Sequence, residues 1–197
     1  MSHLNAIRAD FSSSSVVVYG AYSDAIADAA LSANRFVSPF SLTRMTWIKP
    51  SLLWLMHRSN WAQKSGQTRI LRVAISRSGW EEALSLGVLT SLEAGVHADS
   101  IQWRREFESA LVHVQWDPER SLRGADVGFN SIQVGLSRHV IERFVQQWTL
   151  EISDLTPLVR KVHGLLANGR ADAARKLLPS EKPFSVQTEV ARRLNMS

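Results

Sequence analysis

The residues best suited to chemistry lie in one stretch, RMTWIKPSLLWLMHRSNW (residues 44–61). Arg44 and Lys49 flank Trp47, and a proline that favours the first turn of a helix follows directly. A helix N-terminus with cations beside it attracts anions, and an indole offers a stacking surface for a base or a nicotinamide ring. We therefore predict that Arg44, Trp47 and Lys49 contact a phosphate-bearing ligand, and that Ser51 adds a hydroxyl to the same site.

Two further tryptophans of this stretch favour a simpler interpretation. Trp54 and Trp61 fall on or near one side of a helix over residues 50–61, at the spacing of an amphipathic face. We expect both indoles to be core residues.

A second candidate is HVQWDPER (residues 113–120), at the end of an expected strand. A carboxylate held rigidly there, Asp117 or Glu119, could stabilise a developing cation or act as a base. The alternative is structural, because Asp117 can cap a turn and Glu119 can pair with a neighbouring arginine. The structural alternative is the simpler one for an isolated D-P-E-R turn.

Tyr19 and Tyr22 are the only tyrosines of the chain and lie on one expected strand, over residues 16–23. Their odd separation sends them to opposite faces of that strand. We expect one tyrosine to be buried and the other to line a pocket.

Several chemistries have no support in the sequence. The chain has no Walker loop and none of the motifs G-x-G-x-x-G, H-E-x-x-H or G-x-S-x-G. It has no cysteine, and its six histidines are scattered without the spacing of metal ligands. We expect no metal cofactor.

The positive charge is concentrated in one segment. The net charge of the 197 residues is +5, but residues 29–80 carry eight bases and no acid, while residues 1–28 sum to −2 and residues 81–197 to −1. Such a segment, rich in tryptophan, indicates a phosphate-bearing small molecule or a nucleic acid as partner. Alternatively, some of these arginines pair with acids from the rest of the fold.

The elements that must position these residues alternate along the chain. The patterns predict strands over 16–23, 68–76, 111–116 and 131–136, and helices over 24–33, 50–61, 80–89, 101–110 and from 137 on. The dipeptide Asp117-Pro118 is expected to end the third strand, with residues 120–130 as a surface loop. Residues 156–178 predict a helical hairpin.

This order favours a single α+β domain over residues 1–183, a mixed sheet with packed helices, and residues 184–197 as a tail or short helix. The longest apolar run is too short to span a membrane, and the polar start lacks a signal-peptide pattern. We expect a soluble cytoplasmic protein with no membrane partner.

Four separated segments resemble a known family. VVVYGAYSDAIADAAL, RMTWIKPSLLWLMHRSNW, VQWDPER and SIQVGLS occur in the order seen in the family catalogued as domain of unknown function 4291. The resemblance covers residues 7–183, nearly the whole chain, and the family label implies no particular activity.

The first strand and helix, VVVYGAYSDAIADAALSANRF, also resemble the opening of ADP-ribosyltransferase-like domains. That resemblance implies NAD as cofactor and loss of nicotinamide through an oxocarbenium-like state that a carboxylate stabilises. Carried onto this sequence, it implies Tyr19 and Tyr22 on the nicotinamide side and Arg44 and Lys49 at the pyrophosphate. It also implies Glu119 as the catalytic acid.

Three functions follow as hypotheses. The first is a nucleotide-using transferase of the NAD type, with residues 44–51 as its phosphate-binding segment. The second is a non-catalytic RNA- or DNA-binding module that uses residues 29–80. A partner-binding domain without catalysis is a third.

Overall fold

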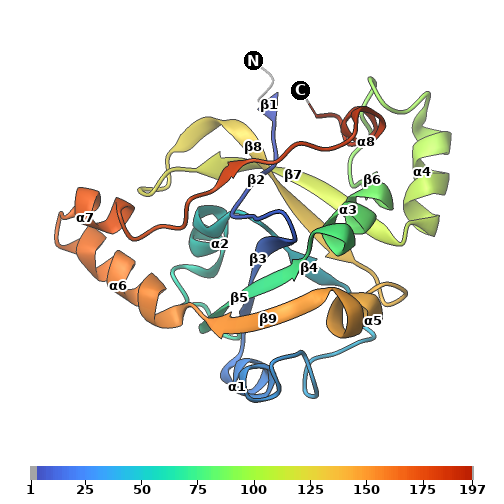
Figure 1. Cartoon of the computed structure of the whole chain (residues 1–197). Coiled ribbons are helices and arrows are strands. Elements are labelled where there is room, and N and C mark those ends of the chain that lie inside the picture. The colour runs from blue at the N-terminus through green and yellow to red at the C-terminus, as the bar shows by residue number, and fades with distance from the viewer. Residues whose placement is uncertain (1–3, 197) are drawn as a thin grey trace.

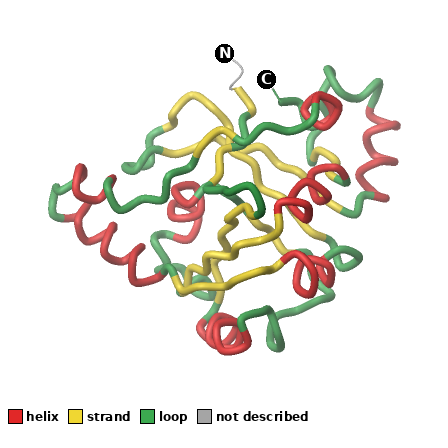
Figure 2. Tube along the Cα trace, viewed as in Figure 1, coloured by secondary structure: helices red, strands yellow, loops and turns green. Residues whose placement is uncertain are grey.

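Two β-sheets form the centre of the molecule, in a computed structural model that describes residues 4–196 (Figure 2). The smaller sheet is antiparallel, in the order β3-β5-β9, and the larger is mixed, in the order β1-β8-β7-β6 with β4 also paired to β8. The smaller sheet comprises β3 (Ser15–Tyr22), β5 (Arg69–Ser76) and β9 (Thr149–Asp154). The larger comprises β1 (Leu4–Asn5), β4 (Thr46–Ile48), β6 (Gly87–Leu89), β7 (Val112–Arg120) and β8 (Asp126–Leu136). A short pair, β2 (Arg8–Ala9) and β10 (Lys182–Pro183), completes the strands of the described residues.

Most helices lie around the outside of these sheets (Figure 1). The helical hairpin and α4 occupy opposite sides of the view. The helices are α1 (Asp24–Ala33), α2 (Leu52–Ser59), α3 (Arg77–Ser85), α4 (Ser100–Ser109), α5 (Ile141–Arg143), α6 (Thr156–Ala167), α7 (Ala171–Arg175) and α8 (Thr188–Arg193), and a π-helical turn spans Phe144–Trp148. The predicted α+β domain and the predicted hairpin, α6 with α7, are confirmed.

Strand β3 is buried on both faces, and it divides the core in two. Val16 and Val18 belong to the larger cluster, which lies between the sheets and α3. Val17 and Tyr19 belong to a second cluster, made with α2 and α6. Because strand side chains alternate in direction, Tyr19 and Tyr22 point to opposite faces, as predicted, and Tyr19 is the buried one at 1% exposure.

The two sheets are joined where β3 passes the end of β4. Tyr19 N–H donates to the carbonyl of Lys49 over 2.8 Å, and Lys49 N–H donates back to Tyr19 over 3.4 Å. This pair of backbone hydrogen bonds fixes Lys49 at the seam between the sheets, three residues before α2 begins.

The structure corrects three expected boundaries. Strand β8 begins at Asp126, inside the segment 120–130 that was expected to be a surface loop, because β7 continues beside it and pairs with it. Strand β7 continues through Asp117-Pro118 to Arg120, because Pro118 lies exposed at an irregular part of the ladder, where a missing N–H is tolerated. Helix α3 begins at Arg77 rather than residue 80, since the Ser76 hydroxyl caps it, and Gly87–Leu89 forms a strand instead of its last turn.

None of the helices in residues 4–196 has the length and apolar character that a membrane crossing requires.

Candidate functional site

A cavity of about 700 Å³ opens at the seam between the two sheets. Its walls come from the end of β3, the segment over residues 40–47, helix α2, and the neighbouring strands β7 and β8. We refer to this cavity as the seam cleft. The residues that line it lie far apart in the sequence, from Gly20 to Gln133.

Three cations line the seam cleft: Arg44, Lys49 and Arg58. Within residues 4–196 none of them forms an ion pair or a side-chain hydrogen bond. In the part of the chain that the structure describes, Asp117 is the one acidic residue that lines the cleft, so three cations face a single carboxylate and the cleft keeps an excess of positive charge that suits an anion.

Other arginines of the basic segment behave differently. Arg69 bonds to Asp28 over 2.6 Å and to Asp154 over 2.9 Å, and Arg77 bonds to Glu81 over 2.9 Å. The alternative that acids from the rest of the fold neutralise the segment thus holds for these arginines but not for the cations of the seam cleft.

Lys49 is the most unusual of the three cations. Lys49 is only 6% exposed, and its Nζ lies 4.4 Å from the centroid of the Trp54 indole. Burial lowers the pKa of Lys49 from 10.5 to about 8, with Asp117 opposing this shift and Arg58 adding to it. A cation–π contact is the main compensation for its loss of water.

Two indoles, Trp47 and Trp54, also line the cleft. Trp47 pairs with Gly135 across β4 and β8, and a Cβ on Gly135 would lie 2.9 Å from Trp47 Cη2. The missing side chain therefore lets the indole lie against the neighbouring strand. Both rings are half-buried, and Nζ of Lys49 lies over the Trp54 ring. An accessible indole face can stack on a planar ring.

A fixed carboxylate stands on the strand side of the cleft. Asp117 Oδ1 accepts a hydrogen bond from Gln115 over 2.8 Å, and Oδ2 accepts one from Gln133 over 2.6 Å. The two glutamines face each other across β7 and β8. They hold the carboxylate in one orientation and leave its remaining lone pairs free for a ligand.

Tyr22 closes one end of the cleft. Its ring packs on Phe36 at 5.2 Å and on Phe40 at 6.2 Å between centroids. Burial raises the pKa of Tyr22 to about 12, although a hydrogen bond with Thr46 opposes the shift, so its hydroxyl stays protonated at neutral pH.

The structure brings together four of the residues predicted to form the site: Tyr22, Arg44, Trp47 and Lys49. It places Tyr19 in the core, where burial raises the pKa of its hydroxyl far above the usual value and the hydroxyl has no hydrogen-bond partner in residues 4–196.

Ser51 and Glu119 line a second, smaller cavity of about 280 Å³. The Ser51 hydroxyl caps α2 by accepting a hydrogen bond from Trp54 N–H over 3.3 Å. At the same helix end, Glu181 accepts a hydrogen bond from Leu52 N–H over 2.9 Å. A carboxyl group of this chain thus occupies the N-terminus of α2, where an anion of the ligand was expected, and the predicted ligand phosphate has to be held by side chains instead.

The two carboxylates of this second cavity affect each other. Burial raises the pKa of Glu181 from 4.5 to about 8, and the nearby charge of Glu119 adds to the shift. The Leu52 N–H and the charge of Arg8 lower the pKa and so oppose it. Glu181 is therefore largely protonated at neutral pH, which limits repulsion between the two groups.

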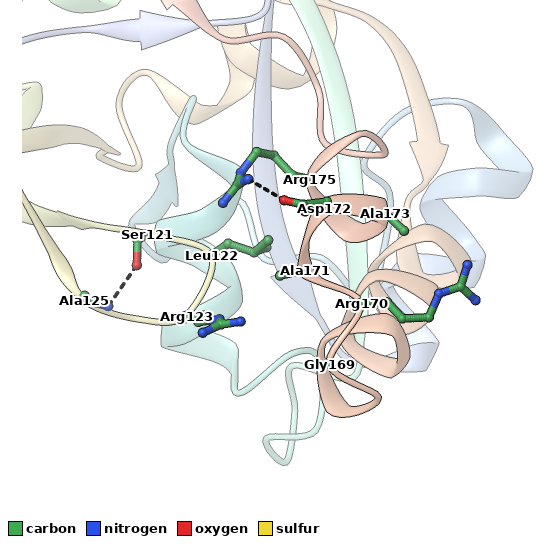
Figure 3. Close-up of a pocket in the computed structure, with 10 residues that line it drawn as sticks. All are labelled: Ser121, Leu122, Arg123, Ala125, Gly169, Arg170, Ala171, Asp172, Ala173 and Arg175. Atoms are coloured by element: carbon green, nitrogen blue, oxygen red, sulfur yellow. Dashed lines mark hydrogen bonds and ion pairs between the residues drawn. The ribbon is translucent and has the colours of Figure 1, made fainter.

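A third cavity, of about 680 Å³, lies between the β7–β8 turn and the start of α7 (Figure 3). Arg175 points to Asp172 and bonds to it over 3.0 Å. The ten residues drawn along its wall include no aromatic side chain, so it offers no stacking surface. The seam cleft is the stronger candidate.

Sequence reasoning missed two important residues of the seam cleft, Trp54 and Arg58, and favoured a structural role for a third, Asp117. Trp54, expected in the core, shares a face of α2 with Arg58 at i+4 spacing, a signal that could have placed both on one wall. Asp117 was expected to cap a turn, because the following proline concealed that the strand continues. Trp61 is buried, as expected, and stacks on His163.

Among the described residues that line the seam cleft, Asp117 is the one carboxylate, and no histidine lines it. Within residues 4–196 no group of three or more His, Asp or Glu side chains lies close enough to hold a metal ion.

A comparison with protein-family models matches residues 6–184 to the family described as Domain of unknown function (DUF4291). The match covers nearly the whole chain, including every wall of the seam cleft. A search of curated proteins finds no match.

Proposed function

The chain belongs to the DUF4291 family, and we propose that it is a nucleotide-using transferase whose nucleotide binds in the seam cleft. The observation that carries the proposal is the convergence of three unpaired cations and two half-buried indoles on one cavity. A nucleotide has the complementary chemistry, because its phosphates need cations and its base needs a stacking surface.

The size and polarity of the cleft support a small molecule. Its volume of about 700 Å³ lies within the range of roughly 300–1,000 Å³ that is typical of ligand pockets. Arg44 and Arg58 are exposed and can close on phosphates, whereas Asp117 is positioned to accept hydrogen bonds from a ribose or a base. NAD and ATP are the first ligands to test.

The choice of a transferase rests on the polar groups beside the cations. Lys49 and Asp117 both face the cleft, and a desolvated lysine is a group that catalyses reactions rather than only binding charge. The catalytic carboxylate of the proposal is Asp117. Glu119, the acid implied by the ADP-ribosyltransferase resemblance, lines the second cavity.

Isothermal titration calorimetry with NAD and with ATP tests the proposal. We expect Arg58→Ala to weaken binding of the nucleotide roughly 10- to 100-fold, because a hydrogen bond to a charged group contributes about 1.5–3 kcal/mol. Arg35→Ala is the matched control, since Arg35 is also exposed and unpaired but does not line the seam cleft. Failure of the wild-type protein to bind any nucleotide would overturn the proposal.

The RNA- or DNA-binding module is the second candidate, favoured by the exposure of Arg44 and Arg58 at the rim of the cleft. It predicts that binding of an oligonucleotide falls steeply with salt, because each neutralised phosphate releases counterions. A shallow salt dependence, together with saturable binding of a mononucleotide, would favour the transferase. The pairing of Arg69, Arg72 and Arg77 with acids already shortens any continuous basic surface.

A further inference from the structure

Lys49 combines three features that a structural lysine seldom shares. It is 6% exposed, its ammonium has neither an ion pair nor a hydrogen bond within residues 4–196, and it faces a cavity large enough for a ligand. A buried ammonium group that lacks an ion pair and a hydrogen bond is destabilising, and the lowered pKa of Lys49 shows that its contacts with Trp54 and Asp117 do not fully offset its loss of water. Functional sites are where such costs are commonly found.

The backbone around Lys49 is held on both sides. Two hydrogen bonds to Tyr19 fix it at the seam between the sheets, and α2 begins three residues later. The Trp54 indole lies beside Nζ at 4.4 Å and restricts where the amine can go. A nucleophile needs this kind of rigid support in order to meet its electrophile at the right distance.

The groups around Nζ suit an attack on phosphorus. Arg44 and Arg58 line the same cavity and can neutralise phosphate oxygens, which otherwise repel a nucleophile. Repulsion from the charge of Arg58 lowers the pKa of Lys49 and so favours the neutral amine, whereas attraction to Asp117 raises that pKa.

From this arrangement we infer that Lys49 is a catalytic nucleophile that carries a nucleoside monophosphate group on Nζ during the transfer. The inference rests on the proposed function, because it requires a nucleotide in the seam cleft. It adds the reaction type, nucleotidyl transfer through a covalent lysine intermediate.

Transfer to Lys49 is a substitution at the α-phosphorus of the nucleotide donor. The lone pair of the neutral Lys49 amine attacks the α-phosphorus, and a P–N bond forms. The bond from that phosphorus to the bridging oxygen breaks, and its electron pair leaves with pyrophosphate when ATP is the donor, or with nicotinamide mononucleotide when NAD is the donor. The attacking nitrogen releases its extra proton to water. An acceptor hydroxyl or phosphate oxygen later attacks the phosphorus, the P–N bond breaks with its electron pair going to Nζ, and Nζ takes up a proton from water or from the acceptor hydroxyl, so that Lys49 returns as the free amine.

The lowered pKa of Lys49, about 8, supports this role, since about one molecule in ten already carries the free amine at pH 7. The rate of adduct formation should rise about tenfold per pH unit well below pH 8 and level off above it. The charges of Arg58 from α2 and Asp117 from β7 influence this profile, and Arg44 from the segment before β4 lines the same cleft.

The experiment is to incubate the full-length protein and Mg²⁺ with ATP, or with NAD, radiolabelled in the phosphate next to adenosine. We expect the wild-type protein to retain label after denaturation, as an adduct that acid hydrolyses and alkali does not, as a phosphoramidate requires. Mass spectrometry of its peptides should place one nucleoside monophosphate on Lys49. This mapping uses the wild-type protein and so does not depend on the folding of a variant.

Lys49→Arg is the informative variant, because it retains a cation but lacks a nucleophilic amine. It should take up no label while still binding the nucleotide in calorimetry. Lys64→Arg is the matched control and should be labelled like the wild type, since Lys64 is exposed and lies outside the cleft.

Three results would overturn the inference while leaving nucleotide binding intact. The wild-type protein could bind a nucleotide but take no label from either donor, the label could map to another residue, or NAD could be cleaved to nicotinamide rather than to nicotinamide mononucleotide. Absence of nucleotide binding is a different result, and it would overturn the proposed function together with the inference.

Discussion

Two glycines shape the seam cleft as much as its charged residues do. A Cβ on Gly20 would lie 2.6 Å from the ring and the hydroxyl of Tyr22, and a Cβ on Gly135 would lie 2.9 Å from Met45 and Trp47. Each glycine lets a large side chain lie flat along a strand. The shape of the cleft therefore depends on these two glycines as well as on Arg44, Lys49 and Arg58.

Gly20→Ala should therefore narrow the cleft. The added methyl group displaces the Tyr22 ring, and we expect nucleotide affinity to fall about tenfold and stability to fall by about 1–3 kcal/mol from overpacking. Calorimetry and urea denaturation measure the two effects. Gly164→Ala is the control, because a Cβ there meets nothing within 4 Å, and it should stabilise helix α6 by about 0.5–1 kcal/mol. Unchanged affinity in Gly20→Ala would show that Tyr22 does not border the ligand.

At the scale of elements, helix α2 separates two cavities of different character. Its side carries Trp54 and Arg58 into the seam cleft, whereas its N-terminus faces Glu181 in the second cavity. The Glu181 carboxyl group accepts a hydrogen bond from a backbone N–H that a helix start leaves without a partner. The position of Trp54 on α2 therefore depends partly on Glu181, which lies 127 positions later in the sequence.

Glu181 should make stability depend on pH. Its pKa is about 8 in the folded protein and 4.5 as the reference value, so the folded state holds a proton that the unfolded chain releases between these pH values. The free energy of unfolding should fall as pH rises through this window, by at most about 1.4 kcal/mol per pH unit.

Glu181→Gln removes this titration but keeps an oxygen that can accept from Leu52. The variant should gain stability relative to the wild type as pH rises from 4.5 to 8, with the largest gain above pH 8. Urea denaturation across this range measures the difference. A constant difference between variant and wild type would contradict the raised pKa.

At the scale of the whole molecule, the C-terminal segment completes the core of the domain. Phe184 and Leu194 are buried, and the Trp116 indole N–H donates to the Leu194 carbonyl over 2.8 Å. Asn5 donates to the Asn195 carbonyl over 2.8 Å, so segments near both ends of the chain lie together, as Figure 1 also shows. The segment expected as a tail or short helix contains helix α8 and packs on the sheets.

Leu194→Ala should therefore destabilise the domain by about 2–5 kcal/mol, because it removes buried methyl groups from a residue with 0% exposure. Thermal or urea denaturation measures the loss. Leu92→Ala, at a residue 47% exposed, is the control and should change stability by less than about 0.5 kcal/mol. Equal effects of the two substitutions would mean that the C-terminal segment does not contribute to the core.

The local elements were largely predictable, because each depends on neighbouring residues. The run VVVY indicates β3, the alanine-rich DAIADAALSA indicates α1, and Thr156-Pro157 indicates the start of α6. The short strands β1, β2, β4, β6 and β10 were not predicted. Each has two or three residues, and pairing with a distant strand rather than local preference makes them strands.

The sequence by itself determined the α+β character, the excess of positive charge in residues 29–80, and the value of Arg44, Trp47 and Lys49 as candidates. Only the tertiary structure decided which cations remain unpaired, because Asp28, Glu81 and Asp154 reach some arginines and not others. Likewise, Asp117 lines the seam cleft and Glu119 lines the second cavity. On a regular strand these two residues would share a face, but the pairing of β7 with β8 shifts between Pro118 and Arg120, and this irregularity separates them. Charge compensation and side-chain direction depend on contacts between distant segments, and these are properties of the folded chain.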